Sequence, residues 1–289
     1  MKTLQLKNDT WELSLVPEWG GRVSALRAQG LDIITPLLAN TFDPVAWPKG
    51  GIYPLMPYSN RLRNARLSHC GLVYALPAHP AAAPHTLHGV AQTLPWAVTA
   101  QDEESITINC LYEGDHWPWP VRFEQRFTLE KNRLNIDLEV TNLGDSSMPA
   151  GVGLHPYFQR HAGMRVETNV GEIWEIDHDY LPTGVVRPSC QPIVMTNDLE
   201  QEYAVYGACW DGLLKVDYQC GQLLLETQAP LHHFVAFAPK GAPYFCLEPV
   251  SHLADAFNSP DSEWEKQGTQ RLQSQQTLTA RLTFIWNLR

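Results

Sequence analysis

Apolar and polar residues alternate along much of the chain with a period of two, the pattern of strands that have one buried and one solvated face. The alternation is clear in TWELSLV (10–16) and again near the C-terminus, over 278–286. Two further alternating runs, 121–129 and 134–140, flank a turn at 130–132, and they are predicted to form a β-hairpin. No window holds a sustained helical period.

Proline and glycine divide the remainder into short segments, with 22 Pro and 19 Gly among 289 residues. No flexible linker and no shift in composition separates one half of the chain from the other. The segment SHLADAFN (251–258) is long enough for one or two helical turns at most. We therefore expect an all-β fold, a large antiparallel β-sandwich that forms a single domain over residues 1–289, with its function carried by loops.

Composition and charge narrow the classes of function. Hydrophobic residues make up 44% of the chain and charged residues 18%, as in a compact globular protein. The formal net charge is −10 and no basic stripe is visible, which argues against a nucleic-acid partner. The first residues lack the apolar segment of a signal peptide, and no stretch reaches the roughly 18 to 20 apolar residues of a membrane span. A cytoplasmic protein without a membrane partner is predicted.

The cysteines give no sign of a metal or disulfide framework. There are six, widely spaced and without a CxxC pair: Cys70, Cys110, Cys190, Cys209, Cys220 and Cys246. Without an export signal, they are expected to be reduced and mostly buried as small hydrophobic side chains. Zinc knuckles place ligands two to four residues apart, so no metal site is expected from them. A phosphate-binding glycine loop is also missing, and no cofactor is predicted.

Four segments place ionisable residues among apolar, proline or glycine neighbours: residues 54–67, 86–96, 151–158 and 245–258. Such surroundings remove water from a charge and can shift its pKa towards neutrality. Glu248 in YFCLEPV is the clearest case. Taken alone, it is more often an outward-facing strand residue. His155 in GLHPYF and His88 in TLHGV are equally ordinary when each is taken alone.

Together, and in this order, the four segments resemble the aldose 1-epimerase family, also called galactose mutarotase-like proteins. The resemblance rests on GGRVSAL and PYSNR, then LHG, GLHPYF, and CLEP followed by DAFN, and it extends from Glu18 to Asn258. It implies the galactose mutarotase-like supersandwich fold. It also implies an isomerase that interconverts the α and β anomers of a monosaccharide, needs no cofactor, and is a monomer or homodimer.

The resemblance assigns the chemistry to three residues. It implies that Glu248 of CLEP is the base, that His155 of GLHPYF is the acid, and that His88 of LHG is the second active-site histidine. Opening a cyclic sugar requires a base for the C1 hydroxyl proton and an acid for the ring oxygen, and both groups must titrate near the working pH. Desolvation should raise the pKa of Glu248, and a nearby carboxylate should keep His155 partly protonated.

Substrate contacts follow from the same resemblance. The sugar-contacting Asn-Arg pair falls on Asn60 and Arg61 of SNR. A further sugar-contacting position falls on His232 in TQAPLHHF, with His233 one residue away as the alternative.

One departure from the family concerns an aspartate that holds sugar hydroxyls in many relatives. In EQEYAVYGACWDG the aligned position falls on Tyr203 or Ala204. Glu202 or Asp211 could take its place, and the identity of the sugar stays open.

Three other functions compete with this interpretation. Arg61 and Arg63, two residues apart, could converge on the phosphate of a hexose 6-phosphate, whereas Arg66 should point elsewhere. A carbohydrate-binding protein without catalysis could stack sugars on Trp117 and Trp119, although such residues more often pack in the core. A glycoside hydrolase would need a second carboxylate flanking the bond, and none stands out in the sequence.

Overall fold

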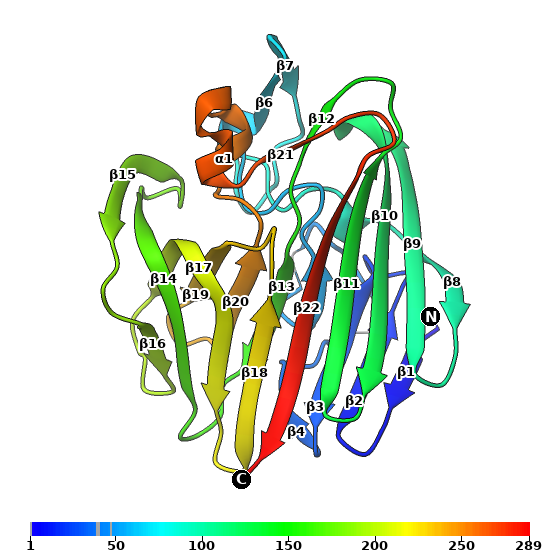
Figure 1. The fold of residues 1–289 in the computed structure, drawn as a ribbon, viewed down its shortest axis with the longest axis vertical. Coiled ribbons are helices and arrows are strands. Elements are labelled where there is room, and N and C mark those ends of the chain that lie inside the picture. The colour runs from blue at the N-terminus through cyan, green and yellow to red at the C-terminus, as the bar shows by residue number, and fades with distance from the viewer. Residues whose placement is uncertain (1, 39–40, 47) are drawn as a thin grey trace.

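The computed structural model describes residues 2–38, 41–46 and 48–289, and strands dominate it (Figure 1). The strands form two facing layers. The first layer runs through antiparallel neighbours in this order: β8 (Ala97–Gln101), β9 (Ser105–Gly114), β10 (Trp117–Glu130), β11 (Arg133–Asn142), β22 (Thr277–Leu288) and β18 (Gly221–Thr227). The predicted hairpin is confirmed, because Glu130 of β10 pairs with Arg133 of β11.

The second layer lies behind the first in Figure 1. Its neighbours in order are β1 (Leu4–Lys7), β2 (Trp11–Val16), β3 (Arg22–Ala28), β5 (Ile52–Pro54), β13 (Leu154–Gln159), β20 (Tyr244–Val250) and β19 (His233–Ala238). The short β4 (Leu31–Asp32) pairs with β3.

Two long strands join the layers. β17 (Tyr203–Asp217) pairs with β19 through its first half and with β18 through its second half, so it belongs to both layers. β14 (Arg165–Ile176) pairs along β17, and β15 (Pro182–Pro188) and β16 (Ile193–Thr196) cover its other edge. The predicted antiparallel sandwich is therefore confirmed, with the two layers continuous through these strands.

The main core fills the space between the layers and is formed by the alternating apolar residues. Trp11, Phe127 and Leu282 are among its fully or nearly fully buried members. A second apolar cluster, which includes Tyr53 and Tyr157, is separate from this core. All seven residues of β20 are buried, so both of its faces are covered. A strand covered on both faces reads as a continuous apolar run, as YFCLEPV does.

Helical structure in the described residues is limited to single turns. The turns are η1 (Arg63–Ala65), η2 (Ala91–Thr93), η3 (Ala256–Asn258), η4 (Asp261–Glu263) and α1 (Trp264–Gln267), beside two small sheets made by β6 (Arg66–His69) with β7 (Leu72–Ala75) and β12 (Met148–Ala150) with β21 (Gln270–Leu272). None of these described helices has the length and apolar character of a membrane span. The single turn within DAFN agrees with the sequence-based expectation for that segment.

The expectation that the cysteines are mostly buried is wrong. All six are free thiols, but only Cys110 and Cys246 are buried. The other four are exposed because they lie at turns or on the outward side of a strand: Cys70, Cys190, Cys209 and Cys220.

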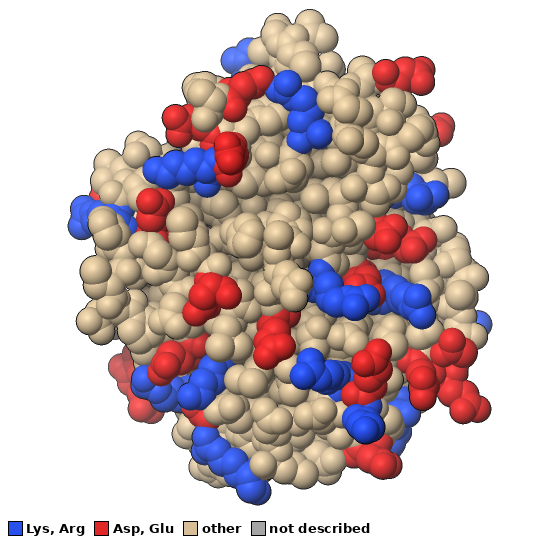
Figure 2. Space-filling model, viewed as in Figure 1, with Lys and Arg blue, Asp and Glu red and all other residues tan. Residues whose placement is uncertain are grey.

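Charges of both signs are interspersed over the face shown in Figure 2, which is the outer side of the first layer. One pair on this layer joins Arg281 of β22 to Asp137 of β11, with 2.5 Å between nitrogen and oxygen. This face carries no continuous basic surface of the kind that nucleic acid requires.

Candidate active site

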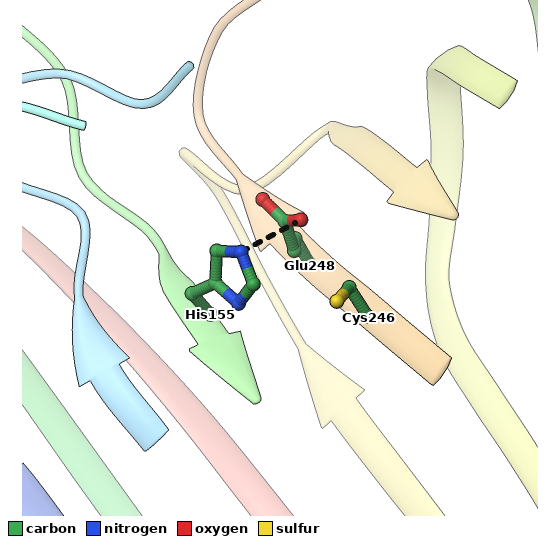
Figure 3. Close-up of side chains that lie close together, drawn as sticks. All are labelled: His155, Cys246 and Glu248. Atoms are coloured by element: carbon green, nitrogen blue, oxygen red, sulfur yellow. Dashed lines mark ion pairs between the residues drawn. The ribbon is translucent and has the colours of Figure 1, made fainter. Parts of the chain in front are cut away.

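Glu248 and His155 face each other across two neighbouring strands of the second layer. β20 and β13 are antiparallel, with Cys246 opposite Tyr157, so the register places Glu248 opposite His155. The distance from His155 Nε2 to Glu248 Oε1 is 3.3 Å, and Figure 3 shows the two side chains pointing at one another. The two motifs that the sequence analysis singled out, GLHPYF and CLEP, thus meet through strand pairing.

The same cross-strand row extends in both directions. On one side, Tyr53 of β5 lies opposite His155. On the other side, Val235 of β19 lies opposite Glu248, and Tyr206 of β17 lies opposite Val235. Directly opposed residues of antiparallel strands project from the same face of the sheet. Five strands therefore build the floor of the site from one row of side chains.

Two loop segments form a wall above this floor. Asn60 and His88 both adopt a left-handed backbone conformation, with φ of 62° and 63°. They bond to each other twice: the Asn60 N–H donates to His88 Nδ1 at 3.1 Å, and the His88 N–H donates to the Asn60 carbonyl at 2.8 Å. Asn60 Nδ2 also donates to the Tyr206 hydroxyl at 2.8 Å, which ties the wall to the floor.

Floor and wall line a half-open pocket, with about 60 Å³ of free space, that contains five of the six predicted site residues. The lining consists of Asn60, Arg61, Leu87, His88, His155, Tyr180, Tyr206, Val235, Phe237 and Glu248. A wider hollow of about 470 Å³ lies over the first layer, but partly exposed ionic side chains such as Glu124, Arg126 and Arg281 line it. The smaller pocket is the one that holds buried titratable groups.

Burial raises the pKa of Glu248 to about 8, and the charge of Arg61 opposes this shift only in part. The residue is 3% exposed, so little water stabilises its carboxylate. The predicted rise in its pKa is confirmed. Oε2 of Glu248 has no hydrogen-bond partner among the described residues, which leaves one carboxyl oxygen for a ligand.

The expected partial protonation of His155 is wrong for the ligand-free site. Burial lowers the pKa of His155 well below its usual value, and the charges of Arg22 and Lys49 lower it further. The pKa of His88 is also lowered well below its usual value, by burial first and then by His155 and Arg61. Near neutral pH the pair therefore holds one proton, on Glu248, while both histidines are neutral.

The further sugar-contacting residue predicted at position 232 lies outside the pocket. His232 precedes β19 and is exposed. The alternative, His233, is buried, but its Nδ1 lies 3.1 Å from the Ser251 carbonyl and its ring does not line the pocket. Gly268 leaves room for this ring, because a Cβ there would lie 2.9 Å from Cε1 of His233.

Neither proposed replacement for the family's aspartate lines the pocket. Glu202 accepts a hydrogen bond of 2.6 Å from the hydroxyl of Tyr180, so it contacts a residue of the pocket lining but does not line the pocket itself. Asp211 accepts a bond from Asn169 on the exposed surface. The residue of this strand that does reach the pocket is Tyr206.

The aromatic and apolar part of the lining could not be predicted from the sequence, notably Tyr180, Tyr206 and Phe237. Tyr180 lies under the guanidinium of Arg61, whose carbon is 5.0 Å from the ring centre. Tyr206 and Phe237 lie on β17 and β19, where aromatic residues read as ordinary core positions. No local signal in the sequence distinguishes them.

Three side chains at the floor each offer one metal-ligand atom, and these atoms lie within 4.8 Å of one another: His155, Cys246 and Glu248 (Figure 3). Burial raises the pKa of the Cys246 thiol well above its usual value. Because a thiol must lose its proton to bind a metal, this environment opposes coordination. The donor set is better suited to moving protons.

The profile of the family described as aldose 1-epimerase matches residues 2–284. The chain belongs to the aldose 1-epimerase family. One relative is the uncharacterized protein YphB of Escherichia coli (strain K12), which is 26% identical over an alignment of 243 residues that covers 78% of this chain and 82% of YphB.

Solved structures share the fold of the family across almost the whole chain. A galactose mutarotase-like protein from Clostridium acetobutylicum superposes with a TM-score of 0.87 at 15% identity, covering 99% of this chain and 95% of that one. A galactose 1-epimerase from Lactobacillus acidophilus NCFM gives a TM-score of 0.77 at 14% identity, covering 99% and 94%.

Proposed function

We propose that this member of the family is an active aldose 1-epimerase, which interconverts the α and β anomers of a monosaccharide. The observation that carries the proposal is the buried Glu248–His155 pair at the floor of the pocket, 3.3 Å apart, in which burial raises the pKa of the carboxyl and lowers that of the imidazole. Ring opening needs one group that accepts a proton while another donates one. A pair with one proton between them meets this requirement in both directions.

In the proposed reaction, substrate binding is accompanied by transfer of the proton from Glu248 to His155. The Glu248 carboxylate then removes the proton from the C1 hydroxyl, and the C1–O5 bond breaks with its electron pair going to O5. His155 protonates O5, which leaves an open-chain aldehyde. Rotation about C1–C2 presents the other face of the carbonyl, and the same steps in reverse close the ring as the other anomer.

Residues of the wall would orient the sugar and stabilise charge that develops on its oxygens. Arg61 brings a guanidinium to the pocket, and His88 is neutral with Nδ1 engaged by Asn60, so its proton resides on Nε2. Fixed donors of this kind lower the energy of a transition state because they need no reorganisation.

The competing functions are less well supported by the same geometry. Arg63 is paired with Asp177 at 3.3 Å and with Asp255 at 3.6 Å, so its charge is already compensated and it is a poor phosphate clamp. Glu248 is the single carboxylate in the described pocket lining, whereas glycoside hydrolysis uses two. A protein that only binds sugars would have no need of the buried ionisable pair, which is costly to bury.

The test is anomer exchange in the Glu248→Gln variant, measured by NMR saturation transfer on glucose, galactose and their 6-phosphates. Exchange should fall by at least about 100-fold, the lower end of what a positioned acid or base contributes. Glu103→Gln, at an exposed loop position, is the matched control and should retain full activity. Exchange in Glu248→Gln within a few-fold of the unmodified protein would rule out Glu248 as the base.

A further inference from the structure

Arg22, the first residue of β3, is a buried cation without a carboxylate partner among the described residues. Its side chain is 0% exposed, and Nη1 donates to the Gly50 carbonyl at 3.1 Å. Nε and Nη2 have no acceptor in the described part of the chain. Burying an uncompensated charge destabilises a fold, so an apolar residue of similar size would serve packing better. The positive charge of Arg22 is therefore not explained by the stability of the fold.

Aromatic rings connect this cation to the catalytic pair. The guanidinium carbon of Arg22 lies 4.3 Å from the centre of the Tyr53 ring. Tyr53 stacks on the imidazole of His155 at 4.6 Å and 23°, and Tyr157 stacks on the same imidazole at 4.6 Å and 26°. The stack follows from strand geometry, because Tyr53 lies opposite His155 and Tyr157 is two residues along β13. The centres of the two phenol rings are 6.2 Å apart, so they contact His155 from neighbouring sides, and Tyr53 alone separates the imidazole from the positive charge.

We propose that Arg22 is a positioning residue of the catalytic pair that acts through Tyr53: it opposes the imidazolium form of His155 and fixes the plane in which Nε2 faces Glu248. The proposal rests on the function proposed above for the pair. A cation near an imidazole disfavours its charged form. The single proton of the pair therefore stays on Glu248 until a ligand enters, and the imidazole remains ready to accept it.

Other groups also face His155 and have to be separated from Arg22. From β20, Glu248 favours the imidazolium whenever it is ionised, and Cys246 is a neutral thiol. His88 meets the imidazole edge-on at 5.1 Å from the wall and is itself neutral. Lys49, in the segment before β5, acts in the same direction as Arg22. The contribution of Arg22 is isolated by changing that residue alone.

The experiment compares Arg22→Met with Arg22→Lys and follows the ring signals of His155 by NMR as the ligand-free protein is titrated. His155→Gln assigns the signals. Arg22→Met should raise the pKa of His155 by about one unit, the size expected for a unit charge within about 9 Å at an effective dielectric constant of about 20. Arg22→Lys keeps the charge and should leave the titration close to that of the unmodified protein.

Anomer exchange gives the second readout. In Arg22→Met, loss of the fixed plane of the imidazole should lower kcat by about tenfold, against the smaller opposing effect of a more basic His155, while KM changes less than about twofold. Arg22→Lys should restore most of kcat. Arg27→Met is the matched control on the same strand, because the side chain of Arg27 is 44% exposed and is paired with Asp32 at 2.6 Å. It should change neither readout.

Each outcome bears on the proposal. An unchanged His155 titration in Arg22→Met overturns it, and so does an equal loss of kcat in the Met and Lys variants, which would show a packing role alone. If Arg22→Met does not fold, Arg22→Gln removes the charge and keeps a polar side chain at this position. A normal His155 titration near pH 6.5 in the unmodified protein also overturns the proposal. Absence of exchange with every sugar would refute the proposed function, while the NMR titration would still decide the role of Arg22.

Discussion

Replacing Glu248 with glutamine should make the protein more stable while it removes the activity. The physical reason is the raised pKa of Glu248, about 8 in the folded protein against 4.5 for an unperturbed carboxyl. Between these two pH values the folded protein keeps a proton that the unfolded chain has released. Stability therefore falls as pH rises through this range, because the folded state binds more protons than the unfolded state.

The magnitude follows from the width of that range. At pH 7 the pH lies 2.5 units above the pKa of 4.5 that the Glu248 carboxyl has in the unfolded chain, while the folded protein keeps the proton. This difference lowers the stability of the folded protein by about 3 kcal/mol. Glutamine has the shape of the protonated carboxyl and does not titrate. For a chain of this size the gain corresponds to a rise in Tm of roughly 5 °C or more. Below pH 4.5 the two proteins should have nearly equal stability.

Urea unfolding of both proteins at several pH values between 4.5 and 8.5 measures this difference. His155 is present in both, so its own contribution to the pH dependence cancels in the comparison. Glu103→Gln, at an exposed position, serves as the control and should give the same pH dependence as the unmodified protein. A Glu248→Gln variant whose stability advantage is the same at pH 5 and pH 8 would refute the reasoning that burial holds the proton on Glu248.

Two further results are expected. The value of kcat/KM for anomer exchange should fall above about pH 8, where Glu248 ionises and the pair loses its single proton. Towards acid it should stay level to well below pH 6.5, because His155 does not take up a second proton there. A decrease in kcat/KM near pH 6.5 would contradict this. Tyr206→Phe should cost about 1–3 kcal/mol in urea unfolding and raise KM, because the buried Asn60 amide loses its acceptor; unchanged stability would show that this bond is dispensable.

The layers of the fold could be predicted from the sequence because the alternation that marks a strand also marks its buried face. The hairpin over 121–140 is such a case, since its turn and both strands are contiguous. β20 is different: its residues are all buried, so YFCLEPV shows no alternation and Glu248 looks like an exception within it. Only the motifs that accompany Glu248 in the chain identified it as a site residue.

The part of the site that escaped prediction depends on pairing between distant strands. Val235 and Tyr206 reach the pocket because β19 pairs with both β20 and β17, a register that no local pattern encodes. His232 lies outside the pocket for a related reason, because a shift of one residue along a strand exchanges the two faces. Arg22 was not singled out within GGRVSAL, since an arginine in an alternating segment reads as exposed, whereas its side chain is fully buried.

The floor of the pocket is formed by paired strands and its wall by loops, so substitutions on the two sides should have different effects. The floor is a row of side chains on strands that are covered on both faces, so the distance between Glu248 and His155 is set by strand pairing. The wall consists of loops that keep Asn60 and His88 in a left-handed conformation through two mutual hydrogen bonds. Substitutions in such loops change contacts without moving the floor. Substitutions in the floor are therefore expected to change the rate of the proposed reaction, whereas substitutions in the wall are expected to change the binding of the sugar.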